Sequence, residues 1–362
     1  MRRLRRRRED VNDARGTARD PVYLATALPG LEEVAADEVR AKVEDAAIRQ
    51  TARGKVFFTS RQPFERLLAL RSVDNLYTVA GRFRVGPHRA HLVDVEEAVA
   101  SLDVGEVVAR ASAAPPHPTC FVNASRSGRH TYSRFELAEA ATQGILARCP
   151  RWRIGSADDH DLEFRLDVAD ETAVFSLRLT PPGFRFRGQE RRFALAALRP
   201  PVAHALVWRS RPAPDDRFAD PFCGSGTILA ERLPYPARRV LGGDLAPEAL
   251  AAARANLPAD PRLTLARWDA RRLPLAAGSV DKVVSNLPFG RQVLAANEIA
   301  GLYRGLAAEV GRVLAPGGHA LLLTDQMEAL TRAAEAAGLR SQAVLSLSLK
   351  GRHPQVILLR RE

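Results

Sequence analysis

The second half of the chain alternates short apolar runs with amphipathic stretches, the pattern of strands and helices in turn. The apolar runs predict strands at residues 216–220, 238–245, 263–270, 279–290 and 319–325, and two more within 342–361 around a turn at 351–354. The amphipathic stretches predict helices from residue 228, over 247–257 and over 298–314, with a turn at 315–318. Strands that alternate with helices in this way predict a parallel, doubly wound α/β sheet.

Upstream of residue 210 the hydrophobic pattern is mixed. Residues 23–30, 56–60 and 75–85 predict strands, and residues 30–42 and 63–71 predict helices, which together indicate a compact α+β module. In a second module we expect a strand that runs into a basic loop at 120–134, and an antiparallel hairpin at 161–169 and 172–180. Ser133 precedes a helical stretch and Glu136 stands three residues later, which is the spacing of a reciprocal helix cap.

The charge of the chain points to a polyanionic partner. Its 362 residues suffice for two or three domains, and 54 Lys and Arg against 42 Asp and Glu give a net charge of +12. Nearly all the cations are arginines, a bias that we attribute in part to genomic base composition. Residues 1–19 are Arg-rich and lack a hydrophobic period, so they predict a disordered tail, either a non-specific nucleic-acid arm or simply a solvated segment.

Several classes of protein are excluded by composition. Three widely spaced cysteines form no disulfide framework and favour a reducing, cytoplasmic location. The eight histidines are scattered, so we expect no metal site. No apolar run approaches the roughly 18 residues of a membrane span, and the basic N-terminus lacks the apolar region of a secretory signal. We expect a monomer that does not contact membranes.

Arginines are concentrated between residues 178 and 211, a stretch that contains eight arginines and a single acidic residue, Glu190. Within this cluster Phe184 and Phe186 alternate with arginines, so the aromatic rings either pack in a core or accompany a nucleic-acid contact. The local nature of the cluster favours nucleic acid. The arginines that we expect to contact it, two of them in the basic loop of the second module, are Arg126, Arg129, Arg185, Arg187, Arg191 and Arg192.

A glycine-rich loop follows the acidic end of the first strand of the second half. Gly224 and Gly226 lack both the lysine of a phosphate-binding loop and the third glycine of a dinucleotide fingerprint. Asp220 would also repel a pyrophosphate, so a cationic ligand such as S-adenosylmethionine is favoured. Asp244 and Asp269 end the next two strands, where they would meet a ribose diol and an adenine amino group; helix capping is the alternative for any one of them. The expected cofactor-binding residues are Asp220, Phe222, Gly224, Gly226, Thr227, Asp244, Leu245, Asp269 and Ala270.

The strongest single signal is the sequence NLPFG at the end of the fourth strand of this half. An amine on a nucleobase regains a lone pair for attack when two acceptors bind its N–H groups, and Asn286 with the backbone of Leu287 and Pro288 would supply them. Phe289 would stack on the base, worth roughly 1–3 kcal/mol. The alternative is an ordinary Asn-Pro type turn after a strand.

These motifs carry a resemblance. In their order, DPFCGSGT, GGD, WDA and NLPFG resemble the class I methyltransferases that act on exocyclic amines of nucleic-acid bases. The upstream YLATALPGLEEVAADEV, with RFRG before the catalytic half, is similar to THUMP-containing tRNA guanine-N2 methyltransferases. The resemblance implies a ferredoxin-like domain at 20–88, a THUMP domain at 89–190 that grips the tRNA 3′ end, and a Rossmann-like catalytic domain at 191–362.

The resemblance further implies N2-methylguanosine in the acceptor stem as product. Family members that act at another guanosine tend to carry Asp at the position of Asn286, so Asn favours the acceptor-stem group. Leu287 departs from the commonest family pattern, which has Pro there. We therefore predict a cytoplasmic tRNA methyltransferase that uses S-adenosylmethionine and no metal. The alternatives are the same transfer to 23S ribosomal RNA or to adenine N6, or a non-catalytic RNA-binding protein with a vestigial cofactor pocket.

Overall fold

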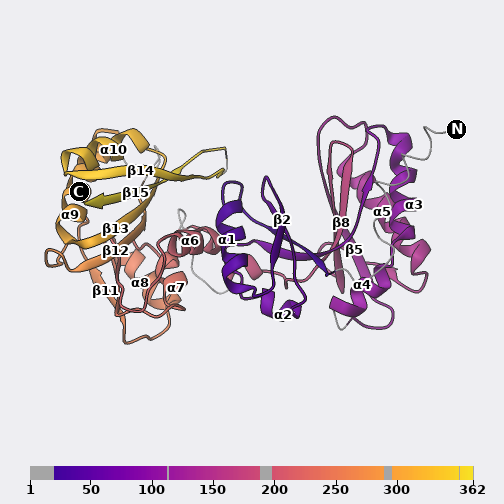
Figure 1. Cartoon of the computed structure of the whole chain (residues 1–362), viewed down its shortest axis with the longest axis horizontal. Helices are drawn as coiled ribbons and strands as arrows, with labels where there is room; N and C mark the ends of the chain where they lie inside the picture. Colours follow the sequence, from indigo (N-terminus) through magenta and orange to yellow (C-terminus); the bar gives the residue numbers. More distant parts are fainter. Residues whose placement is uncertain (1–19, 112–113, 188–197, 289–295, 350, 362) are drawn as a thin grey trace.

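The computed structural model describes residues 20–111, 114–187, 198–288, 296–349 and 351–361, and it groups them around two sheets. The catalytic half surrounds a seven-stranded sheet at one end of the molecule (Figure 1). An eight-stranded sheet built from the first half occupies the middle and the other end. The expected disordered tail at 1–19 lies outside the described residues.

The eight-stranded sheet has the order β2-β3-β1-β4-β8-β7-β5-β6 and runs through both predicted N-terminal modules. Antiparallel pairing of β4 with β8 joins the two modules edge to edge, and Tyr77 pairs with Arg178 in its register. The predicted hairpin is confirmed as the antiparallel pair β7 and β8. The strands are β1 (Val22–Thr26), β2 (Ala47–Ala52), β3 (Lys55–Thr59), β4 (Asn75–Arg84), β5 (Thr119–Ser127), β6 (Arg153–Ile154), β7 (Leu162–Ala169) and β8 (Thr172–Arg178).

The longest helix of this half, α5 (Arg134–Arg148), begins at a side-chain cap that the sequence predicts. Ser133 Oγ accepts from the Glu136 N–H at 3.2 Å and the Glu136 carboxylate accepts from the Ser133 N–H at 2.9 Å, which confirms the predicted reciprocal cap. The helix predicted at 63–71 is reduced to one short turn, and two helices and two strands (α3, α4, β2 and β6) were not predicted. The helices are α1 (Glu32–Lys42), α2 (Phe64–Leu67), α3 (Leu92–Ser101), α4 (Val104–Ala111) and α5 (Arg134–Arg148), with 3₁₀ turns η1 (Arg89–His91) and η2 (Phe184–Phe186).

The seven-stranded sheet has the order β11-β10-β9-β12-β13-β15-β14. Its first five strands are parallel, as predicted, and β15 runs antiparallel between β13 and β14. The strands are β9 (Arg217–Asp220), β10 (Arg239–Asp244), β11 (Leu263–Arg267), β12 (Val280–Asn286), β13 (Leu314–Thr324), β14 (Leu339–Ser346) and β15 (Gln355–Arg361). The helices are α6 (Pro200–Arg209), α7 (Thr227–Arg232), α8 (Pro247–Asn256), α9 (Ala296–Val313) and α10 (Met327–Ala336).

The prediction of a turn at 315–318 is wrong. These residues belong to β13, and the pairing of β12 with β13 shifts register between Val280 and Lys282 to accommodate them. Gly317 takes a φ of +76°, which a glycine adopts without the cost of a side chain. The glycines therefore mark an irregularity inside the strand rather than its start.

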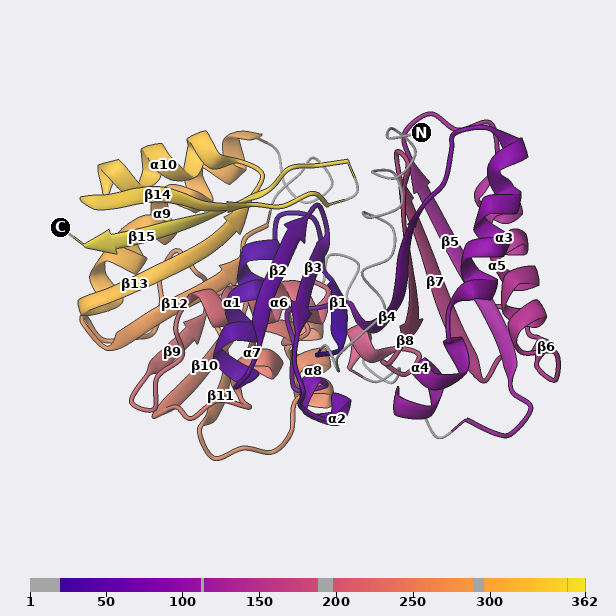
Figure 2. The ribbon, with the colours of Figure 1, turned by 45° about the vertical axis from the view of Figure 1, so that its right-hand side comes forward.

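A shared apolar core fastens the first module to the catalytic half. One buried cluster includes Val39 and Leu67 from the first module together with Leu206 of α6 and Leu229 of α7. The β14–β15 hairpin also extends over the first module (Figure 2), where the Ser348 N–H donates to the Pro29 carbonyl at 3.0 Å. The second module, in contrast, has its own core around β5, β7, α3 and α5.

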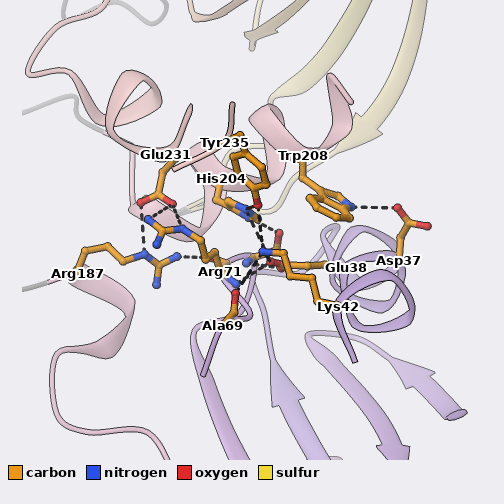
Figure 3. Close-up of polar contacts among 11 residues, drawn as sticks. Asp37, Glu38, Lys42, Ala69, Arg71, Arg187, His204, Trp208, Glu231 and Tyr235 are labelled. Carbon is orange, nitrogen blue, oxygen red and sulfur yellow. Dashed lines mark hydrogen bonds and ion pairs between the residues drawn. The ribbon is translucent and has the colours of Figure 1, made fainter. Parts of the chain in front are cut away.

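A buried polar network lies across the same interface (Figure 3). Glu231 of α7 has no exposed side-chain surface and binds Arg71 at 2.8 Å and Arg187 at 3.3 Å. His204 of α6 bonds the Ser72 hydroxyl through Nδ1 at 2.8 Å and the Tyr235 hydroxyl through Nε2 at 2.7 Å. Burial lowers the pKa of His204 to about 3, so this imidazole is neutral and acts as one donor and one acceptor.

We expect the substitution Glu231→Gln to destabilise the protein, because it leaves two partly buried guanidinium groups without a counter-charge. The free energy of unfolding should fall by roughly 3 kcal/mol, measured by urea denaturation. Glu171→Gln is the matched control, because Glu171 pairs with Arg84 on the surface and its loss should cost less than about 1 kcal/mol. Equal stability of the two variants would contradict a structural role for the buried pair.

Candidate active site

The order of the strands reverses at β9, and the polar residues singled out by the sequence gather at this point. β10 lies on one side of β9 and β12 on the other, all three parallel, so their carboxyl ends share one edge. Asp220 ends β9, Asp244 ends β10 and Asn286 ends β12. A reversal of strand order is where open α/β sheets bind ligands. The structure thus brings these three predicted residues to one place.

The glycine-rich loop is held against this edge by its backbone. The Cys223 N–H donates to the Gly243 carbonyl at 2.9 Å, and the Gly224 N–H donates to Asp244 Oδ2 at 3.0 Å. Gly224 has a φ of +51° and Gly226 a φ of +83°, both in the left-handed region. A Cβ on Gly224 would meet no atom within 4 Å, so the loop presents bare backbone to open space there. Thr227 follows as the first residue of α7.

The three acids sit in three different environments. Asp220 is 1% exposed and accepts from Ser285 Oγ at 2.6 Å, and its burial raises its pKa to about 7. Asp244 accepts from two backbone N–H groups, those of Gly224 and Ala246, each at 3.0 Å. Asp269 is paired with the guanidinium of Arg271, which lowers the pKa of the carboxyl. Both oxygens of Asp269, expected to meet an adenine amino group, therefore already have a donor in this structure.

Trp268 packs at the carboxyl edge of β10 and, although it belongs to the WDA motif, was not among the predicted site residues. Its indole N–H donates to the Pro221 carbonyl at 3.2 Å, and a Cβ on Gly243 would lie only 1.9 Å from its ring. The glycine is therefore needed for the ring to pack against β10. Among the predicted cofactor residues, Leu245 is more than half exposed, Phe222 is partly buried and Ala270 is buried.

The start of the NLPFG segment is tightly held, with one exception. The Leu287 N–H donates to the Leu323 carbonyl at 3.0 Å, and the Pro288 carbonyl accepts from the Tyr303 hydroxyl at 3.1 Å. Asn286 Oδ1 is buried and accepts no hydrogen bond from the residues that the structure describes. An unpartnered buried acceptor costs free energy, so it indicates a donor that arrives with a ligand. Phe289, expected to stack on the base, lies outside the described residues.

These features fit a ligand that is cationic and carries no phosphate. Among the described residues, neither Asp220 nor Asp244 lies within ion-pair distance of a cationic side chain, so both carboxylates lack a counter-charge. The ammonium and sulfonium of S-adenosylmethionine would supply positive charge at this edge. Asp220 acts on such a ligand through its charge, because its surface is covered.

Two of the arginines expected to contact RNA lie beside a cavity in the second module. Arg126, near the end of β5, and Arg129, on the loop that follows, are exposed and, with His88 and His130, line an open pocket of about 460 Å³. Pro87, Gly128 and Thr131 complete the lining. Guanidinium groups around a cavity of this size are suited to phosphate and base edges of a nucleic acid.

The arginine cluster at 178–211 is less exposed than its sequence suggested. Phe184–Phe186 form a 3₁₀ turn rather than a strand, and Phe184 packs against the shared core. Arg187 is 10% exposed, pairs with Glu231 and donates to the Arg71 carbonyl, so its expected role in RNA contact is corrected to one in the interface of Figure 3. Arg185 is exposed and lies over the Phe186 ring, while Arg191 and Arg192 lie outside the described residues.

Comparison with known proteins assigns the catalytic half. A family model described as RMKL-like, methyltransferase domain, matches residues 187–355. Among solved structures, TrmN from Thermus thermophilus matches with a TM-score of 0.79 at 26% identity, covering 94% of this chain and 100% of that one. SMU.472, a methyltransferase complexed with SAH, matches with a TM-score of 0.75 at 16% identity over 96% of this chain and 99% of that one, which shows the shared fold.

Curated relatives extend over nearly the whole chain. The tRNA (guanine(6)-N(2))-methyltransferase THUMP3 of Mus musculus is 24% identical and aligns over 93% of this chain and 88% of its own length. The tRNA (guanine(6)-N2)-methyltransferase of Thermus thermophilus is 29% identical over 85% of this chain and 90% of its own. These findings confirm the predicted class I methyltransferase fold and the resemblance to tRNA guanine-N2 methyltransferases.

The described residues hold neither a cluster of metal ligands nor a membrane-spanning helix. Within them, no group of three or more His, Cys, Asp or Glu side chains is placed to hold a metal ion. No helix in the same ranges is both long and apolar enough to span a membrane.

We expect Asp220 to make stability depend on pH. The folded state keeps the proton of this carboxyl up to about pH 7, whereas the unfolded chain releases it near the ordinary value of 3.8. The free energy of unfolding of the wild type, relative to Asp220→Asn, should therefore fall as the pH rises from 3.8 to about 7 and be constant below that window. Urea unfolding of both proteins at a series of pH values measures the difference. A difference that does not change with pH would show that Asp220 is already ionised when folded.

Proposed function

We propose that this protein transfers a methyl group from S-adenosylmethionine to the exocyclic N2 amine of a guanosine in tRNA. The observation that carries the proposal is the buried Oδ1 of Asn286, at the reversal of strand order, which has no partner among the described residues. Asp220 and Asp244 end two strands at the same edge, and no described cationic side chain pairs with either. Relatives named tRNA guanine-N2 methyltransferases that align with most of this chain support the choice of substrate.

The residues at the carboxyl edge of the sheet have separate roles in this reaction. When bound, S-adenosylmethionine supplies a methyl group activated by a sulfonium. Asn286 Oδ1 accepts one N–H of the guanine amine, and we assign the Leu287 carbonyl to the other, since Tyr303 occupies one lone pair of the Pro288 carbonyl and holds it toward α9. With both hydrogens held, the nitrogen lone pair points out of the ring system and toward the methyl group. The catalytic contribution is orientation, and no covalent intermediate with the protein is needed.

The acceptor stem is the proposed location of the guanosine. Two relatives that align with most of this chain carry guanine(6) in their names, and Asn286 matches the residue typical of that group. The basic cavity at Arg126 and Arg129 is the proposed contact for the tRNA, within the segment expected to be a THUMP domain. The exposed Arg185 would add a second contact. Action as a monomer in the cytoplasm, without a metal, stays a prediction from the sequence.

The decisive experiment supplies labelled S-adenosylmethionine with unmodified tRNA transcripts and identifies the modified nucleoside and its position by mass spectrometry. N2-methylguanosine in the acceptor stem supports the proposal. Label in N6-methyladenosine, or transfer only to 23S ribosomal RNA, would replace it by one of the alternatives. Equilibrium dialysis that detects no binding of S-adenosylmethionine would favour a vestigial pocket.

The substitution Asn286→Ala should nearly abolish turnover, because it removes the side-chain acceptor that orients the amine. We expect kcat to fall by roughly 100-fold or more, with the Kd for S-adenosylmethionine close to that of the wild type. Asn123→Ala, on an exposed position of β5, is the control and should keep the wild-type rate. If Asn286→Ala keeps that rate as well, the assignment of the catalytic residue fails.

The paired substitution of Arg126 and Arg129 by Ala should weaken tRNA binding in a salt-dependent manner. Each lost phosphate contact should reduce the slope of log K against log salt by about one. Arg332→Ala on α10 removes one exposed arginine at the far end of the molecule and serves as the control for loss of a positive charge away from the pocket. Titrations at several salt concentrations distinguish them. An unchanged slope in the double variant would remove this cavity from the proposed RNA surface.

A further inference from the structure

Behind the NLPFG segment, buried groups form a chain of hydrogen bonds that ends on the segment itself. Tyr303 lies on α9 and Thr324 ends β13, and neither has exposed surface. The Tyr303 hydroxyl oxygen lies 3.1 Å from the carbonyl oxygen of Pro288 and 2.8 Å from Thr324 Oγ1. The Gln326 N–H donates to Thr324 Oγ1 at 2.9 Å. Three contacts thus connect the end of β13 to the loop that follows the neighbouring strand, β12.

One arrangement of protons satisfies all three contacts. The Pro288 carbonyl can only accept, so the Tyr303 hydroxyl donates its single proton to it. The same hydroxyl then accepts from Thr324, whose oxygen in turn accepts from the Gln326 N–H. Burial raises the pKa of Tyr303 to about 12, so this donor keeps its proton at neutral pH. The chain is fully satisfied and has a fixed direction, as buried polar networks require.

The last acceptor in this series of hydrogen bonds is the Pro288 carbonyl, at a position where the backbone has little other constraint. The proline ring locks φ of Pro288 and removes its N–H, so that ψ is the one soft dihedral left in this residue. The direction of the Pro288 carbonyl and the value of ψ are set together. The hydrogen bond from Tyr303 therefore fixes the direction of the Pro288 carbonyl and, with it, the ψ of Pro288.

The preceding residues are anchored from the other side. The Leu287 N–H bonds the Leu323 carbonyl, and the Leu287 side chain is buried in the core of this half. Ser285, the residue before Asn286, bonds Asp220. Asn286 and the Leu287 carbonyl, the two proposed acceptors of the amine, thus lie between two fixed points. Loss of the anchor at Pro288, or of the anchors at Ser285 and Leu287, would leave the acceptors free to shift relative to the reacting amine.

We propose that Tyr303 is a positioning residue for methyl transfer, which holds the Pro288 carbonyl with a hydroxyl that Thr324 orients, and so fixes the acceptors at Asn286 and Leu287. Tyr303 does not touch the substrate or the cofactor. Its effect therefore falls on the rate of the chemical step and not on binding of S-adenosylmethionine. This inference rests on the proposed function.

The first test is Tyr303→Phe, which removes the hydroxyl and keeps the buried ring. With tRNA transcript as substrate we expect kcat to fall by roughly 10–100-fold, because small misplacements of reacting groups cost rate steeply. The KM for tRNA and the Kd for S-adenosylmethionine, from equilibrium dialysis, should stay near the wild-type values. Tyr23→Phe makes the same chemical change in a buried ring on β1, remote from the loop, and should keep the wild-type kcat.

The second test concerns Thr324. Thr324→Val keeps the shape and removes the hydroxyl that orients Tyr303, so kcat should fall, and Thr324→Ser should restore most of it. The double variant Tyr303→Phe/Thr324→Val should be no slower than Tyr303→Phe alone, because the chain is already broken. A merely structural role would instead lower the melting temperature without separating kcat from KM and Kd.

The outcomes separate this inference from the proposed function. Failure of the wild-type enzyme to methylate any tRNA overturns the proposed function, and the positioning role with it. An active wild type whose Tyr303→Phe variant is equally fast overturns the positioning role alone. Thr324→Ser as slow as Thr324→Val, in a folded protein, also overturns it.

Discussion

The reversal of strand order at β9 is the constraint on which the proposed site depends. Because β10 and β12 lie on opposite sides of β9, the loops that follow the three strands diverge and leave one edge open. The bond from Ser285 Oγ to Asp220, at 2.6 Å, joins two of these strands at that edge. The backbone pairing of the sheet therefore sets the distance between the carboxylates and Asn286. Loop residues can vary around this frame without moving the acceptor of the amine.

The two carboxylates nearest this point favour a cationic ligand. Asp220 is buried, and among the described residues no cationic side chain pairs with it, so it keeps its proton and its pKa rises to about 7. A cation bound at the same edge lowers the pKa of Asp220, because its positive charge stabilises the ionised carboxylate. This attraction offsets the cost of burying the carboxylate, which the folded protein alone does not offset. A nucleotide phosphate would do the reverse. The electrostatic potential at this edge thus favours a positively charged ligand, independently of any specific contact.

The sequence predicted those elements whose pattern is strong and local. The parallel strands have continuous apolar runs, and Ser133 and Glu136 cap a helix from three residues apart. The strand β2 was missed because it is a largely exposed edge strand without an apolar face, and the turn signal at 315–318 was overridden by pairing with β12. At the site, the residues that end the strands were predicted. The burial of Asp220 and its contact with Ser285 were not, because their partners stand far apart in the sequence.

Arginine content says less about RNA contact than the net charge suggests, because many guanidinium groups are already paired. Within the catalytic half, ion pairs join arginines to acids at Arg217–Asp281, Arg232–Asp216, Arg262–Asp260, Arg271–Asp269 and Arg312–Glu309. An arginine such as Arg187 would have to give up a buried carboxylate to bind a phosphate, which exchanges one ion pair for another. An exposed arginine beside a cavity, such as Arg126, gains the phosphate and the release of counterions together. The position of each cation, and not the total of +12, therefore decides where a polyanion binds.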